Sequence, residues 1–305
     1  MRLRARQYQL RLTSGNGELT TWDFQEITSA RRLQANYRKS VLFLAWIGFD
    51  GMWQPGNPVP LPNVGRRFGV NRRVRLGDVT PKGRLRLDAT ARYLQDIAND
   101  DAVDGNYSDV HGWVVRRTEM WVYDFPVYMQ DVSLTTWCGG YGSHWAERRT
   151  TIRGATSGHI ETAALWVHVD LKSLKPSPLP ADFIPIVDEA SGGRKIRANL
   201  VLGKELPALS EDGSTREAWP TRFADFDAVG HLNNASYWIA AEEYLSAHGD
   251  LRAPLHVTVE HHLSVDPGQG IDIVTQKLPG RVVLRHVLGG DRVAALTQIV
   301  RLDQK

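Results

Sequence analysis

The most chemically informative stretch of the chain is residues 225–237, DFDAVGHLNNASY, which gathers two carboxylates, a histidine and two asparagines. Gly230 allows a sharp turn before a helix. Backbone N–H groups in a first helical turn lack intrahelical acceptors and can stabilise negative charge that develops on a carbonyl oxygen. Asp227 and His231 would flank that point, which suits acyl transfer to water. The spacing alone fits an ordinary capped helix equally well.

Two helices and a set of strands are predicted to position this stretch. Helical spacing of apolar residues predicts one helix over 85–99 and a second from near His231 to about Ala247. Apolar residues lie nearly all round the second, which indicates a buried helix. An extended segment covers 66–76. Runs rich in β-branched and aromatic residues predict antiparallel strands at 112–125, 132–137, 147–152, 160–169, 255–263, 271–277, 281–287 and 293–302.

The two halves of the chain resemble each other. Residues 74–89 align with residues 221–236, so one unit of extended segment, helix and four strands is used twice. A sheet wrapped around one helix is the hotdog fold. We therefore predict an α+β tandem (double) hotdog, each an antiparallel sheet around one long helix, with a continuous sheet and both helices covered. The alignment pairs Arg75 with Arg222, Asp78 with Asp225, Gly83 with Gly230 and Leu85 with Leu232.

Composition excludes several classes of protein. Residues 1–75 hold 13 Lys/Arg against 4 Asp/Glu, which leaves a net charge of −6 on the body of the chain, so we expect no nucleic-acid binding. The longest apolar run, residues 41–49, is too short to span a membrane, which needs ~20 residues. The single cysteine, Cys138, permits no intramolecular disulfide and no cysteine-based metal site. We expect a cytoplasmic protein with no membrane insertion.

The pattern DxDxxxHxNNxxY at 225–237, with a Glu a few residues on, resembles the signature DxDxNxHxNNxxYxxWxxE of the acyl-ACP thioesterases. The match is loose around Tyr237, Trp238 and Glu242/Glu243. The first half is similar to that family as well. Residues 72–98 resemble its opening strand and first helix, and residues 113–137, WVVRRTEMWVYDFPVYMQDVSLTTW, resemble its strand region. The likeness covers 66–302, with much of 185–216 outside it.

This resemblance places catalytic roles on named residues. The family's catalytic Asp falls on Asp227 and its His on His231, and backbone amides near Asn233 and Asn234 would stabilise the oxyanion. The family's catalytic Asn falls on Val229, which cannot supply an amide, so Asn233 or Glu260 could take its place. A further acidic residue falls on Ser264 in an ungapped alignment that pairs Pro126 with Ser264. Substitutes, if the register slips, are Glu260 and Asp266.

The resemblance also implies a domain plan. Residues 1–64 would be a weakly ordered or non-native N-terminal arm, and a protein starting at Met52 is expected to fold and act. Residues 65–172 would be an N-terminal hotdog that binds the acyl chain, 173–217 a linker with one short strand at 183–187, and 218–305 the catalytic C-terminal hotdog. Candidate residues to line the acyl tunnel are Trp113, Trp121, Trp137 and Trp166.

The implied reaction is hydrolysis of fatty acyl-ACP to free fatty acid and acyl-carrier protein (ACP), which ends chain elongation in fatty acid synthesis. No metal or other cofactor is expected, and the chain would be a monomer or homodimer. The acidic carrier would dock on a basic pair, for which the candidates are Arg116-Arg117, Arg148-Arg149 and Arg194-Lys195. The alternatives are an acyl-CoA thioesterase, a double-hotdog hydroxyacyl-thioester dehydratase and a non-catalytic acyl-binding module. Cys138 is expected to be a small buried residue rather than a nucleophile.

Overall fold

The computed structural model describes residues 12–13, 19–20, 58–107, 112–170, 173, 175–202, 213–249 and 251–302. The chain divides into two units, Met1–Gly56 and Asn57–Lys305. In the first, the short strands β1 (Leu12–Thr13) and β2 (Leu19–Thr20) pair antiparallel. Of the predicted arm, residues 1–64, the structure also describes 58–64, which form no helix or strand; the rest of that expectation lies outside the described residues.

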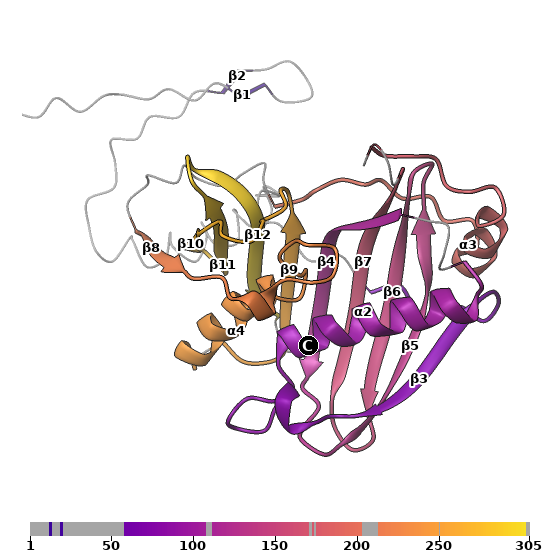
Figure 1. Ribbon diagram of the computed structural model, residues 1–305, viewed down its shortest axis with the longest axis horizontal. Helices are drawn as coiled ribbons and strands as arrows, with labels where there is room; N and C mark the ends of the chain where they lie inside the picture. The colour runs from indigo at the N-terminus through magenta and orange to yellow at the C-terminus, as the bar shows by residue number, and fades with distance from the viewer. Residues whose placement is uncertain are drawn as a thin grey trace, which may run out of the picture. The chain divides into compact units, whose positions relative to one another are not determined.

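The second unit is built on one ten-stranded antiparallel sheet, in the order β3-β5-β6-β7-β4-β9-β12-β11-β10-β8. Five strands belong to each half of the chain, and the halves join where β4 pairs with β9. A long helix, α2, lies across the first five strands and a shorter one, α4, across the others (Figure 1). The predicted double hotdog with a continuous sheet is confirmed.

The strands follow the predicted segments closely, because β-branched and aromatic residues alternate along them between the helix-covered face and the opposite face. The first half contains β3 (Arg67–Arg73), α2 (Leu87–Asp104), β4 (Gly112–Asp124), β5 (Asp131–Tyr141), β6 (Trp145–Gly154) and β7 (His159–Val169). The second half contains β8 (Ser214–Trp219), α4 (Tyr237–Ala247), β9 (Leu255–His261), β10 (Ile271–Leu278), β11 (Arg281–Leu288) and β12 (Arg292–Arg301).

The internal repeat predicted from the sequence is present as repeated geometry. A short 3-10 turn precedes each helix, at Leu76–Asp78 and Phe223–Asp225. In each turn the aspartate carboxylate accepts the backbone N–H three residues before it, at 3.2 Å in Asp78 and 2.8 Å in Asp225. Gly83 and Gly230 both have positive φ, +81° and +90°. Isolated bridges Val79↔Leu85 and Phe226↔Leu232 close the two loops. The two loops and the helix starts that follow them therefore match residue for residue, 147 positions apart.

Several elements differ from the prediction. Strand β5 runs four residues past its predicted end at Trp137, and β8, which was not predicted, begins within the predicted linker. The predicted strand at 183–187 is wrong, because Ile184–Ser191 forms helix α3, with Pro185 in its first turn, where proline is tolerated. Helix α2 begins two residues later than predicted, at Leu87, and ends five residues later, at Asp104. Helix α4 begins at Tyr237 rather than near His231, because backbone hydrogen bonds hold the preceding loop: Leu232 N–H donates to Val265 O and Asn233 N–H to Asp225 O.

Residues 194–202, within the predicted linker, lie over the sheet face opposite the helices. Ile196 N–H donates to Tyr141 O at 3.0 Å, and its carbonyl accepts the Trp145 indole N–H. Farther along, the amides of Val201 and Leu202 donate to the Glu260 carboxylate on β9. We call residues 194–202 the strap. It connects strands of both hotdogs and so stiffens their junction.

Candidate active site

Asp227 lies in the loop before α4 with both carboxylate oxygens engaged. Oδ1 accepts the backbone N–H of Val229 at 2.9 Å, and Oδ2 accepts the side-chain amide of Asn233 at 3.0 Å. The amide orientation of Asn233 is fixed, since its Oδ1 accepts the Ala235 N–H at 2.8 Å. Of Asn233 and Glu260, the two residues considered for the missing amide, only Asn233 lies beside Asp227 and donates an amide N–H to it. The Val229 side chain is 80% exposed.

His231 bonds a carboxylate other than Asp227. Its Nδ1 lies 2.9 Å from Asp266 Oδ1, and the two side chains are about half exposed (46% and 53%). Of the acidic positions considered from the sequence, Asp266 is therefore the one placed at the histidine. Ser264 is exposed on the same segment and makes no hydrogen bond within the described part of the chain.

The internal alignment that paired Pro126 with Ser264 is wrong by one residue. Leu85 N–H donates to Pro126 O and its counterpart Leu232 N–H donates to Val265 O, so Pro126 corresponds to Val265. Glu260 is removed from the site: it is fully buried on the opposite sheet face, where the strap amides bind it. Burial raises the pKa of this carboxyl despite those hydrogen bonds.

The backbone N–H of Asn234 is a free donor at the start of the helical turn that leads into α4. Within the described residues nothing accepts a hydrogen bond from it. Its counterpart in the first half is the N–H of Leu87, the first residue of α2, which donates to Oε2 of Glu242 at 3.1 Å. The N–H at this position of the repeat therefore binds a carboxylate oxygen in the first half, at Leu87. In the second half, at Asn234, it has no acceptor among the described residues.

A small cavity adjoins Asn234, between the two helices and the sheet of the first hotdog. Its volume, about 30 Å³, has room for a water molecule. Its polar wall includes Gln95 of α2 and Thr118, Thr150 and Thr162 of the sheet. Trp166 and Arg148 close its far side and also line a second, larger cavity. Together the two cavities extend along α2 from Ala91 to Val103, about 18 Å at 1.5 Å per residue.

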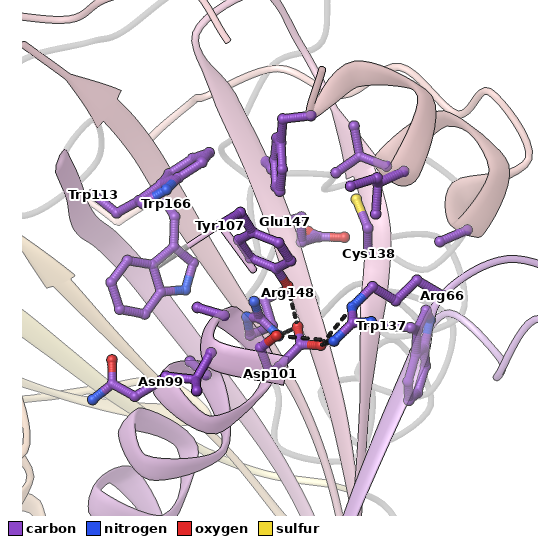
Figure 2. Close-up of a pocket in the computed structure, with 18 residues that line it drawn as sticks. Arg66, Asn99, Asp101, Tyr107, Trp113, Trp137, Cys138, Glu147, Arg148 and Trp166 are labelled. Atoms are coloured by element: carbon purple, nitrogen blue, oxygen red, sulfur yellow. Dashed lines mark hydrogen bonds and ion pairs between the residues drawn. The ribbon is translucent and has the colours of Figure 1, made fainter. Parts of the chain in front are cut away.

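The larger cavity, of about 460 Å³, lies between the C-terminal half of α2, the strands β4–β7 and helix α3. Figure 2 shows its aromatic and charged walls, with the Asp101 carboxylate between Arg148 and Arg66. Asp101 also accepts the Tyr107 hydroxyl at 2.7 Å, so its negative charge is balanced within the wall. Three of the four candidate tryptophans line this cavity: Trp113, Trp137 and Trp166.

Trp121 is not among the residues that line either cavity. It is 3% exposed, and its ring lies 4.6 Å from that of His256 and 5.7 Å from the Arg149 guanidinium. A bulge in β4 between Val115 and Arg117 explains its position. The extra residue reverses the alternation, so Met120 and Val122 pack in the helix-covered core and Trp121 faces the other way. The prediction that Trp121 lines the tunnel is therefore wrong.

Three of the six side chains in the candidate basic pairs are ion-paired within the fold and at most 20% exposed. Arg149 is buried and bonds Glu147, and its neighbour Arg148 bonds Asp101 at 2.6 Å. Arg117 pairs with Glu119 at 3.0 Å with a side chain only 12% exposed. Arg194 and Lys195, at the start of the strap, do present exposed charge, with side chains 39% and 63% exposed. Both are also ion-paired, Arg194 with Glu147 at 2.7 Å and Lys195 with Asp188 at 3.8 Å. Lys195 is the only exposed residue of the six, so Arg194-Lys195 is the pair that we keep as the candidate for docking.

Cys138 lines the larger cavity, where burial raises the pKa of its thiol to about 11. It is therefore a neutral thiol near pH 7, as expected from its place far from His231. No group of three or more His, Cys, Asp or Glu side chains in the described ranges is placed to hold a metal ion. In those same ranges, no helix is long and apolar enough to cross a membrane.

Comparison with known proteins places the fold and the loop in the thioesterase class. The model of the acyl-ACP thioesterase N-terminal domain matches residues 65–187, and that of the C-terminal domain matches residues 209–299. The chain belongs to the acyl-ACP thioesterase family.

Sequence relatives and solved structures agree with this assignment. An uncharacterized protein of Mycobacterium tuberculosis is 28% identical over 78% of this chain and 94% of its own length. A palmitoyl-acyl carrier protein thioesterase of Cuphea hookeriana is 24% identical over 66% of this chain and 55% of its own. The 12:0-ACP thioesterase from Umbellularia californica superimposes with a TM-score of 0.61 at 17% identity, covering 77% of this chain and 96% of that structure. An acyl-ACP thioesterase from Bacteroides thetaiotaomicron gives 0.60 at 15%, covering 77% and 97%.

Proposed function

We propose that this protein hydrolyses fatty acyl-ACP thioesters to free fatty acid and ACP, and so ends chain elongation in fatty acid synthesis. One observation carries the proposal: a carboxylate held by two N–H donors, Asp227, lies in the loop that leads to the free amide of Asn234. A base and an oxyanion donor at one helix start are what attack of water on a thioester carbonyl requires.

In the proposed reaction, Asp227 takes a proton from water as the water oxygen bonds to the thioester carbonyl carbon. The carbonyl oxygen becomes an oxyanion, which the Asn234 N–H stabilises. Collapse of the tetrahedral intermediate breaks the carbon–sulfur bond, and the ACP-linked thiolate leaves and takes up the proton. His231, oriented by Asp266, donates to the oxyanion or to the leaving sulfur.

The repeat supports the placement of the oxyanion. In the first half, Arg84 stands at the position of His231, and Arg84 and the Leu87 N–H together bind the Glu242 carboxylate. An oxygen anion is therefore accepted between these two positions of the fold. The acyl chain would run from there past Trp166 into the larger cavity, whose aromatic walls bury apolar surface. Arg194-Lys195 is the proposed contact for the carrier.

A hydrolysis panel of acyl-ACPs and acyl-CoAs of different chain lengths, with detection of the released thiol, tests this function. We expect wild-type turnover with ACP substrates, and a fall in kcat of roughly 10²-fold or more for Asp227→Ala and for His231→Ala, the range for a positioned acid–base group. Ser264→Ala is the matched control from the same site region and should retain activity. Hydration or dehydration without thiol release would indicate the dehydratase, binding without turnover an acyl-binding module, and preference for CoA an acyl-CoA thioesterase.

A further inference from the structure

The helix start in the first hotdog is closed by a residue from the second. Glu242, 5% exposed on α4, reaches across the helix pair to the start of α2. Its Oε2 accepts the Leu87 N–H at 3.1 Å, and its Oε1 lies 2.7 Å from an Arg84 guanidinium nitrogen. The position where a substrate oxygen could bind is therefore filled by a carboxylate from the protein itself. In addition, Thr80 and Arg84 replace Asp227 and His231 in this half.

The 147-residue repeat has a counterpart to this contact in the other half. Leu87 corresponds to Asn234, and Glu242 on α4 corresponds to Gln95 on α2. Gln95 and Asn234 line the same small cavity, so the counterpart side chain does approach the start of the catalytic helix. Within the part of the chain that the structure describes, no group holds the amide of Gln95 by a hydrogen bond.

The chemical difference between the two counterparts is one of charge. A carboxylate can only accept hydrogen bonds, so Glu242 occupies the amide in its own half and would repel an oxyanion there. A side-chain amide carries two N–H donors besides its acceptor oxygen. Within the described residues that oxygen does not accept the Asn234 N–H, which stays open to the substrate. With Glu at this position, as in Glu242, the backbone N–H at the helix start is already bonded to a carboxylate. With Gln, as in Gln95, the corresponding N–H stays available to a ligand.

We infer that Gln95 donates a hydrogen bond from Nε2 to the thioester carbonyl oxygen, as a second donor beside the Asn234 N–H. This role rests on the proposed function, because it supposes that a thioester is hydrolysed at that helix start. The catalytic site would then be shared between hotdogs: base, histidine and backbone amide from the second, and a side-chain donor from the first.

Three variants test this inference. Gln95→Met removes the donor at similar volume, and we expect kcat to fall roughly tenfold to a hundredfold with little change in melting temperature, since loss of one oxyanion donor costs up to ~10²–10³. Gln95→Glu should cost at least as much at pH 8, because the new carboxylate would bind the Asn234 N–H as Glu242 binds Leu87. Its kcat relative to wild type should rise as pH falls and that carboxyl is protonated. Glu242→Gln is the mirror control, expected to lower stability while kcat stays near wild type.

A measurement independent of turnover completes the test. The exchange of the Asn234 amide proton, followed by NMR at pH 8, should slow in Gln95→Glu relative to wild type. Wild-type hydrolysis together with near-normal kcat in Gln95→Met and Gln95→Glu would overturn the inference and leave the proposed function intact. Lack of wild-type hydrolysis would instead overturn the proposed function. In that case, unchanged Asn234 exchange in Gln95→Glu would overturn the placement of Gln95 as well.

Discussion

The side-chain amide of Asn233 bridges the Ala235 N–H, at 2.8 Å, and the Asp227 carboxylate, at 3.0 Å. It thereby ties the proposed catalytic base to the start of the helix. A hydrogen bond to a charged group contributes about 1.5–3 kcal/mol. With part of that expressed in the transition state, Asn233→Ala should lower kcat roughly tenfold or more, since ~1.4 kcal/mol is one decade. Steady-state kinetics on an acyl-ACP checks this, and an unchanged kcat would show that Asp227 needs no such support.

Val229 gives a second prediction. Its N–H already serves Asp227, and its side chain is 80% exposed, so an asparagine there would bury no unpaired amide. We expect Val229→Asn to change the free energy of unfolding by no more than a typical surface substitution, within about ±0.5 kcal/mol, and so to leave the melting temperature nearly unchanged. Its kcat should stay within a few-fold of wild type, because Asn233 already supplies the amide. Thermal unfolding and steady-state kinetics on the same preparation test both expectations. A large gain in kcat would mean that the Asn233 amide supports the Asp227 carboxylate poorly.

Substitution of Asp266 should lower kcat, whereas substitution of Ser264 or Glu260 should not. Asp266→Asn removes the carboxylate that orients His231 and should lower kcat roughly tenfold to a hundredfold, within the range for acid–base groups. The exposed pair contributes at most about 1 kcal/mol to stability, so the melting temperature should barely change. Glu260→Gln should do the reverse: reduce stability by disturbing the strap and leave the kcat of the folded protein near wild type. Equal kinetic effects of the two substitutions would contradict this assignment.

Two buried histidines predict acid sensitivity. Burial lowers the pKa values of His261 and His286, which flank the Tyr237 ring, to about 3 from an ordinary value of 6.5. The unfolded chain binds protons below about pH 6.5 and the folded chain does not. The free energy of unfolding should therefore be constant above that pH and fall below it, by about 1.4 kcal/mol per pH unit for each histidine, down to about pH 3.

Urea unfolding between pH 7.5 and 5 measures this slope before most carboxylates titrate. His286→Gln should flatten it by about one proton, whatever its effect on the stability itself. An identical slope in the wild type and in His286→Gln would show that this buried histidine does not set the acid limit.

The repeat and the loop around Asp227 could be predicted from the sequence, because both are local patterns. A positive-φ glycine, a capping aspartate and a bridge between near neighbours depend only on residues a few positions apart, as in the matched loops around Gly83 and Gly230. The choice among Ser264, Glu260 and Asp266 was different. It depends on how the segment after β9 approaches the loop, which a one-residue register change alters.

The errors at Trp121 and at the pair Arg148-Arg149 have two different origins, a β-bulge and ion pairs within the fold. A single bulge in β4 turns Trp121 away from the cavity that Trp113 lines, and the sequence carries no clear sign of that extra residue. Arg148 and Arg149 read as a surface pair, but Asp101 and Glu147 neutralise them within the fold. The Arg148–Asp101 pair joins residues 47 positions apart, which spacing could not anticipate, whereas Arg149 and Glu147 lie two residues apart on β6 and so share one face of the strand.

The two halves share one plan but differ in length, since α2 has 18 residues against 11 in α4, and β4 has 13 against 7 in β9. The additional turns of α2 line the larger cavity, well beyond the loop that carries Asp227 and His231. Under the proposed function, substitutions near Ala102 and Val103 would reshape the space for an acyl tail without touching Asp227 or His231. Selectivity for the acyl chain and the rate of hydrolysis would then depend on different copies of the duplicated unit, and each could change without the other.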